Sequence, residues 1–183
     1  MDPRQARLQK EYQDLVELRN QCDGIFEFYY NKSNSSYYVT INKLKTFIGK
    51  NNTSDRHKFI LSIPPEFPIN QPTIIFEKRI FHPNWYDNGR VCFGHKWNPS
   101  ITIRELIIDI VKMMMFDLVN VRSPASPEAT SWYCLNKNNI QKQVTKFQFP
   151  PLDTINSSTD DTIEIIADSE DIVIDDEDII IIE

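Results

Sequence analysis

The chain has 183 residues, of which 40% are hydrophobic, and a formal net charge of −6. This length suits one domain with an appendage, and the hydrophobic fraction is enough for one sizeable core. Three widely separated cysteines, Cys22, Cys92 and Cys134, argue against a disulfide framework and favour a reducing compartment. Because the sequence shows neither an apolar leader nor a run of roughly 18 apolar residues, we expect a soluble protein of the cytoplasm or nucleus, without a membrane segment.

The charge is distributed unevenly along the chain. Residues 151–183 hold 12 of the 26 acidic residues and no Lys or Arg, so residues 1–150 carry 20 basic and 14 acidic residues. A basic body attracts acidic partners. Its aromatic and basic residues do not alternate in the way that would favour nucleic acid. We therefore expect protein partners and no nucleic acid.

The first half of the chain predicts one helix followed by strands. Apolar residues form a stripe along residues 4–21, Asp2 can cap this helix, and Pro3 suits its first turn. Lys43–Asp55 shows no clear period. Four prolines keep residues 64–72 out of regular structure. Strands are predicted at Ile25–Tyr30, Tyr37–Asn42, His57–Ile63 and Thr73–Phe76.

The second half predicts helices. Thr102 and Glu105 form a capping box in front of a helix at Ile103–Asp117, whose broad apolar face, methionines included, indicates core packing. Residues 128–147 predict a last helix that is broken or polar around Asn136–Asn139. The order of elements indicates an α+β fold with an N-terminal helix, a four-stranded antiparallel sheet and C-terminal helices.

The composition changes at about residue 149. We therefore predict a folded domain over residues 1–148 and an acidic tail over residues 149–183. Charge repulsion and the lack of aromatic residues favour disorder in the tail. Its β-branched clusters are nevertheless good strand formers against the edge of a partner's sheet.

Cys92 is the candidate for covalent chemistry. It lies eight residues after Asn84, across a turn made by Asn88-Gly89. Cysteine is the most nucleophilic side chain near neutral pH, and its acyl product is a reactive thioester. The spacing therefore points to an acyl carrier.

Other chemistries have weaker support. Gly49–Thr53 lacks the first glycine and the adjacent Lys-Ser/Thr of a phosphate-binding loop. Cys92 and His95 lack the second ligand pair that a structural zinc site needs. A protease dyad of Cys92 with His82 or His95 stays open, although nothing in the sequence marks the group that would orient the histidine.

Three blocks, in order and correctly spaced, resemble the ubiquitin-conjugating enzyme family over about residues 4–147. The blocks are Phe59–Pro68 continued through Pro72 and Phe76, then Arg79–Asn84 with Asn88-Gly89 and Val91-Cys92, then Trp97-Asn98-Pro99 with Ile101–Ile103 and the apolar helix. The spacing of eight residues from Asn84 to Cys92 is that of the family.

The resemblance implies a mechanism. Cys92 would accept the C-terminal carboxyl of ubiquitin or a ubiquitin-like protein from an activating enzyme, and pass it to a lysine or a ligase. Asn84 would either donate to the oxyanion or brace the loop. His82 would shape the turn rather than act as a base, and Asn120 and Ser123 would lie in the active-site gate. No cofactor or metal is implied, because the modifier arrives activated. The alternative is a non-catalytic relative that only binds and presents a modifier.

Three departures from the family bear on the site. Lys43–Asp55 stands where the family has a glycine-rich segment, and the stretch from Cys92 to Trp97 is about three residues shorter than usual. Ser123 replaces the acidic residue that commonly precedes the gate proline. The gate therefore has one carboxylate fewer that could orient an incoming lysine or lower its pKa.

The resemblance also implies partner surfaces. Arg4, Arg7 and Lys10 on the first helix would contact the activating enzyme, and a ligase would dock at Ile69 and Pro99. Two tail segments resemble SUMO-interacting motifs, which add a strand to the modifier's sheet; alternatively, the tail folds back on the basic body. The apolar residues of these segments are Ile163, Ile165, Ile166, Ile172, Val173 and Ile174.

Overall fold

The structure is a computed structural model that describes residues 2–149. Its elements confirm the predicted α+β arrangement of one helix, a sheet and then helices. The tail beyond Phe149 lies outside the described residues, so the boundary at residue 148 stays a prediction. In chain order the elements are α1 (Pro3–Gln21), β1 (Phe26–Asn31), β2 (Ser36–Ile41), β3 (Thr46–Phe47), β4 (Thr53–Ser54), β5 (His57–Ser62), β6 (Thr73–Phe76), α2 (Ile103–Met114) and α3 (Pro127–Gln143).

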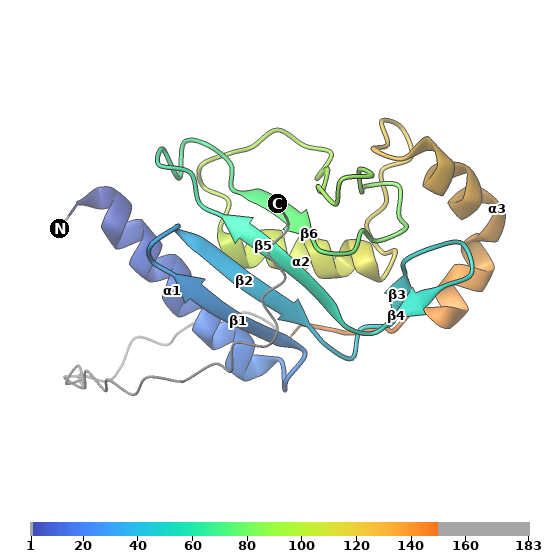
Figure 1. The fold of residues 1–183 in the computed structure, drawn as a ribbon, viewed down its shortest axis with the longest axis horizontal. Coiled ribbons are helices and arrows are strands. Elements are labelled where there is room, and N and C mark those ends of the chain that lie inside the picture. Colours follow the sequence, from blue (N-terminus) through green and yellow to red (C-terminus); the bar gives the residue numbers. More distant parts are fainter. Residues whose placement is uncertain (1, 150–183) are drawn as a thin grey trace. The chain divides into compact units, whose positions relative to one another are not determined.

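The main sheet is an antiparallel meander in the order β1-β2-β5-β6. The pairing register aligns Phe28, Val39, Phe59 and Phe76 across its inner face, because side chains of a strand alternate between the two faces. Helix α2 covers this face with side chains that are almost completely buried, and α1 lies along β1 (Figure 1). Each large apolar side chain buried in this way contributes roughly 1.5–3 kcal/mol.

The N-terminus of α2 has the predicted capping box. Thr102 Oγ1 accepts a hydrogen bond from Glu105 N at 3.1 Å, and Glu105 Oε2 accepts one from Thr102 N at 2.7 Å. The long connection from β6 to α2, residues 77–102, runs outside these elements and carries Cys92 (Figure 1). No helix of residues 2–149 combines the length and the apolar character that a membrane crossing requires.

The stretch Lys43–Asp55, which has no sequence period, forms the short hairpin β3–β4. Phe47 of β3 is buried against the rings of Phe116 and Trp132, with centroids 6.3 and 4.9 Å away. This packing builds a second apolar cluster at the end of the domain where α3 lies (Figure 1). This hairpin is therefore stabilised by contacts with distant residues, which explains why no local periodicity marks it in the sequence.

The two C-terminal helices end earlier than predicted. Helix α2 stops at Met114, because Phe116 adopts the left-handed φ of 58° and directs the chain away from the helix axis. Helix α3 passes Asn136–Asn139 without the break that the polar residues suggested. It ends at Gln143, after which Val144 is extended and Thr145 N donates to Lys45 O at 2.9 Å.

Candidate active site

The turn that precedes Cys92 is anchored by buried side chains. His82, Asn84 and Trp85 are at most 1% exposed. His82 Nδ1 accepts a hydrogen bond from Asn84 N at 3.0 Å, which leaves the proton of the neutral ring on Nε2. The ring packs against Trp85 and Phe116, and burial lowers the pKa of His82 to about 3. His82 is therefore a neutral, buried part of the turn, and its geometry does not suit a base at the surface.

The turn at Asn88-Gly89 returns the chain toward Asn84. Tyr86 N donates to Arg90 O at 2.9 Å, and Gly89 has a φ of 80°. A Cβ at Gly89 would lie 2.5 Å from Phe76 O, closer than real atoms approach. Glycine is thus required by both the backbone angle and the contact with β6.

Asn84 and Cys92 are joined by two hydrogen bonds. Cys92 N donates to Asn84 O, and Asn84 Nδ2 donates to Cys92 O, both at 2.8 Å. Asn84 Oδ1 accepts from Asn120 N at 2.9 Å. The side chain of Asn84 therefore links the cysteine segment to the gate loop at residues 118–126, which is the geometry of a brace.

The gate loop is organised by Asn120. Asn120 Oδ1 accepts from Arg122 N and Ser123 N, at 3.2 and 3.1 Å, and its Nδ2 donates to Ser123 O at 2.8 Å. Ala125 N donates to Pro83 O at 2.8 Å, so the loop is also fixed to the turn before Cys92. These bonds hold Asn120 and Ser123 at the cavity that Cys92 also lines.

A surface cavity of about 430 Å³ opens at Cys92, whose thiol is free and half-buried. The predicted residues Asn120 and Ser123 line it, whereas His82 and Asn84 lie beneath the surface. The lining consists of Gln71, Tyr86, Val91, Cys92, Phe93, Gly94, His95, Lys96, Asn120 and Ser123.

Tyr86 is a residue of this cavity that the sequence analysis missed. The charge of Cys92 and a hydrogen bond with it raise the pKa of the Tyr86 phenol. The signal was available in the sequence, because Trp85 is a core residue and the next side chain of an extended segment points the other way. Tyr86 is 45% exposed and stands beside the thiol.

The alternatives named above find no matching geometry in residues 2–149. No hydrogen bond joins Cys92 to His82 or His95 in this part of the chain, and His95 Nδ1 lies 3.2 Å from Lys96 O instead. Within the same residues, no three His, Cys, Asp or Glu side chains gather to hold a metal. Gly49–Thr53 forms the turn of the β3–β4 hairpin, with Ile48 N donating to Asn52 O, rather than the N-terminus of a helix.

Comparison with known proteins agrees with this geometry. A family model described as ubiquitin-conjugating enzyme matches residues 7–148. The chain belongs to the ubiquitin-conjugating enzyme family. A curated relative, the SUMO-conjugating enzyme UBC9 of Caenorhabditis elegans, is 37% identical over 86 residues, which cover 44% of this chain and 51% of the relative. The aligned part thus spans about half the length of that relative.

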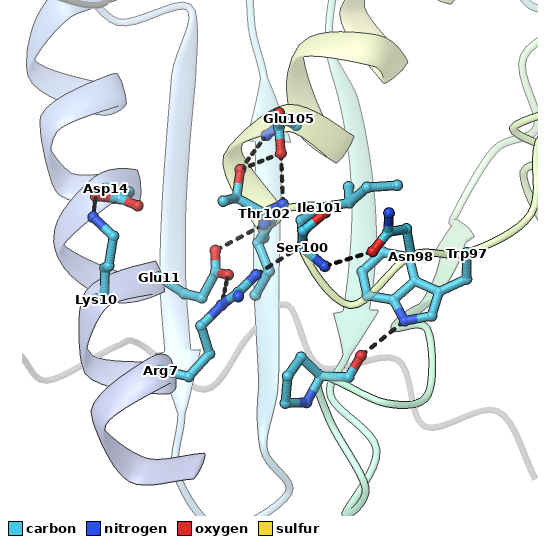
Figure 2. A network of polar contacts seen from close by, with 12 residues as sticks. Arg7, Lys10, Glu11, Asp14, Trp97, Asn98, Ser100, Ile101, Thr102 and Glu105 are labelled. Carbon is cyan, nitrogen blue, oxygen red and sulfur yellow. Dashed lines mark hydrogen bonds and ion pairs between the residues drawn. The ribbon is translucent and has the colours of Figure 1, made fainter. Parts of the chain in front are cut away.

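The predicted contact for an activating enzyme falls on residues of α1 that differ in exposure. Lys10 is exposed and pairs with Asp14 at 3.5 Å, whereas Arg4 and Arg7 are half-buried. Arg7 Nε lies 2.6 Å from Glu11 Oε1, and its guanidinium also donates to Ile101 O at 2.9 Å (Figure 2). Arg7 therefore joins α1 to the segment before α2, and Lys10 is the freer basic group for a partner.

Glu11 completes this connection within the family fold. Its Oε2 accepts from Ile103 N at 2.7 Å, so a carboxylate of α1 satisfies a donor at the first turn of α2 (Figure 2). Burial raises the pKa of Glu11, although the bonds from Ile103 N and Arg7 oppose that effect. Sequence reasoning did not single out Glu11, because no local pattern connects it with residue 103.

The predicted ligase contacts, Ile69 and Pro99, are both exposed, and Ile69 is 72% exposed. Trp97 Nε1 donates to Pro68 O at 2.8 Å, which fixes the two loops to each other. The predicted tail contacts, Ile163, Ile165, Ile166, Ile172, Val173 and Ile174, lie outside the described residues.

Proposed function

We propose that this chain accepts ubiquitin or a ubiquitin-like protein from an activating enzyme as a thioester on Cys92 and passes it to a lysine or to a ligase. The observation that carries the proposal is the double hydrogen bond between Asn84 and Cys92, which holds a free, half-buried thiol at the edge of an open cavity. Family membership supports it, because the family is described as ubiquitin-conjugating enzyme.

The residues around the thiol have separate roles in this proposal. Thiolate is the attacking species. Asn84 braces the gate loop through its two bonds, and its second amide hydrogen can donate to the oxyanion of the tetrahedral intermediate, a contribution on the order of 3 kcal/mol in other enzymes. Asn120 and Ser123 form the rim that the acceptor meets.

Exposure ranks the residues of the partner surfaces. The exposed Lys10, with the half-buried Arg4 and Arg7 on the same helix, would contact the activating enzyme, and the exposed Ile69 and Pro99 would contact a ligase. The similarity to a SUMO-conjugating enzyme puts SUMO beside ubiquitin as the first modifiers to test.

The test is incubation of the full chain with an activating enzyme, ATP and either modifier, followed by a non-reducing gel. We expect an adduct that disappears with reductant and is absent from Cys92→Ser. Cys134→Ser is the matched control, since Cys134 is an exposed thiol on α3 outside the cavity, and it should load normally. No adduct with either modifier would favour the non-catalytic alternative, in which the chain only binds and presents a modifier.

The acidic tail carries a second part of the proposal, from sequence alone. Its two isoleucine segments followed by acidic residues would pair with the sheet edge of a ubiquitin-like protein. Deletion of residues 151–183 should weaken non-covalent binding of the modifier, measured by titration calorimetry, and leave thioester formation intact. Unchanged affinity would refute the tail's role.

A further inference from the structure

The cavity at Cys92 contains no carboxylate among its described lining residues. Where the family commonly places an acidic residue, this chain has Ser123. A lysine that attacks a thioester must lose a proton, because its amine becomes a cation once the new bond forms. Some other group on the wall, or water alone, has to take that proton.

Few of the lining side chains are suited to this role near neutral pH. Of the titratable groups on the described wall, Lys96 is already a cation, and a phenol such as that of Tyr86 keeps its proton near neutral pH, because phenols ordinarily have a pKa of about 10. Cys92 itself carries the acyl group. His95 is the remaining one, and imidazole is the side chain that exchanges protons in this pH range.

The local geometry presents His95 as an acceptor. Its Nδ1 lies 3.2 Å from the carbonyl oxygen of Lys96, and a carbonyl can only accept, so Nδ1 carries the ring proton. The Nε2 atom then has the free lone pair, and no hydrogen bond to it occurs within residues 2–149. The side chain is exposed at the cavity wall.

The shortened wall also places His95 near the gate. Gly94 adopts a φ of 76°, and a Cβ there would lie 3.2 Å from Asn120 Nδ2. The backbone therefore passes directly against the gate loop, and His95 follows at the next position. Four charged or titratable groups surround His95. They are Lys96 on the same loop, Asp109 of α2, whose pKa is raised by burial and lowered in part by its interaction with His95, and Tyr86 and Cys92 across the cavity.

We propose that His95 is the proton acceptor for an attacking lysine, in place of the missing gate carboxylate; this inference rests on the proposed function. The lysine nitrogen forms a bond to the thioester carbonyl carbon, and the resulting ammonium gives its proton to His95 Nε2. The C–S bond then breaks, its electron pair stays on sulfur, and the products are the amide, the Cys92 thiolate and a protonated His95. Water takes the proton in the next step.

The test uses a small acyl group, so that it does not depend on which modifier the protein carries. In the full chain with Cys134→Ser, the half-buried Cys92 is the most accessible cysteine, because the other remaining one, Cys22, is buried. Cys92 is loaded by exchange with the thioester of acetylglycine and 2-mercaptoethanesulfonate. Discharge to free lysine and to free cysteine is followed by mass spectrometry between pH 6 and 8.

We expect His95→Gln to slow discharge to lysine by about tenfold or more, less than the roughly 100-fold at the low end for a general base, because the site is open to water. Discharge to cysteine, whose thiolate needs no base at the moment of attack, should change less than about twofold. An unchanged ratio of lysine to cysteine discharge would overturn the proposal.

Adding Ser123→Asp to His95→Gln restores a carboxylate at the gate, and it should recover most of the lysine discharge. A double variant as slow as His95→Gln would assign the loss to the shape of the wall and would also overturn the proposal. Failure of enzymatic loading by ubiquitin or SUMO would contradict only the proposed function, because this assay does not use an activating enzyme.

Discussion

The segment before Cys92 and the segment after it differ sharply in how the fold holds them. Before the cysteine, His82, Asn84 and Trp85 are buried, and backbone bonds fix the turn to Asn84 and to β6. After it, residues 94–96 are exposed, and their side chains line an open cavity. The first segment can change only at the expense of the core, whereas the second can change with little effect on stability. In terms of the proposed function, the segment before Cys92 would hold the acyl carrier in place, and the segment after it would face the acceptor.

The largest expected effect tests the buried segment at Gly89. Gly89→Ala forces a side chain into the left-handed region and against Phe76 O, where its Cβ would lie at 2.5 Å. We expect a loss of about 3 kcal/mol in the free energy of unfolding, since the backbone angle alone costs roughly 1–2 kcal/mol. Urea denaturation measures it. A variant as stable as the parent would show that the turn is not held as tightly as the contact implies.

Asn84 distinguishes a brace from an oxyanion donor. Asn84→Ala leaves Asn120 N and Cys92 O without partners, and should cost about 2 kcal/mol of stability. Asn84→Asp keeps the acceptor for Asn120 N and removes the donor. If Asn84 only braces the gate, the aspartate variant should retain more of the stability and of the lysine discharge. If donation to the oxyanion dominates, both variants should lose discharge by a similar factor.

The buried imidazole of His82 gives a pH dependence with a definite sign. The pKa of His82 is about 3 in the folded protein, against about 6.5 for an unperturbed histidine. Between about pH 6.5 and pH 3, the unfolded chain therefore binds a proton that the folded protein excludes. Stability from this group is complete above about pH 6.5 and falls by about 1.4 kcal/mol per pH unit as the pH drops toward 3. His82→Asn can still accept from Asn84 N, and should lack this part of the slope. Urea titrations at several pH values compare the two, and equal slopes would contradict the burial argument.

The smallest effect is expected from the exposed segment, at Gly94. Gly94→Ala also requires a left-handed angle, but its Cβ would meet only the side-chain amide of Asn120, at 3.2 Å. We expect a loss of about 1 kcal/mol. Loading of Cys92 should stay within about twofold, while the ratio of lysine to cysteine discharge changes. A loss of stability equal to that of Gly89→Ala would remove the difference between the two segments.

The sequence predicted the elements whose signals are local. Thr73–Phe76 is correct to the residue, and the capping box at Thr102 and Glu105 needs only a spacing of three. The β3–β4 hairpin has two-residue strands, and its anchor, Phe47, packs against Phe116 and Trp132 far along the chain. No periodicity can reveal such an element.

The same distinction applies to the site. The resemblance to the family implied that Asn120 and Ser123 belong to a gate beside Cys92, and all three residues line the cavity. Sequence reasoning did not select Tyr86 as a site residue, although it follows the core residue Trp85 and its side chain should therefore face away from the core. Arg7 looked like one of several basic residues on a helix face, and only the fold shows it bound to Ile101 O and Glu11.

The contact between Glu11 and Ile103 joins residues that are 92 positions apart in the sequence. By contrast, β1 and β2 pair across a turn of a few residues. Because closing a longer loop costs more entropy, we expect the meander to form early in folding and α1 to become locked late. On a ribosome, Cys92 and its turn would leave the exit tunnel before Ile103, whose amide binds Glu11, has emerged. Pulse labelling of amide hydrogens during refolding should then find the β1–β2 amides protected before Ile103 N.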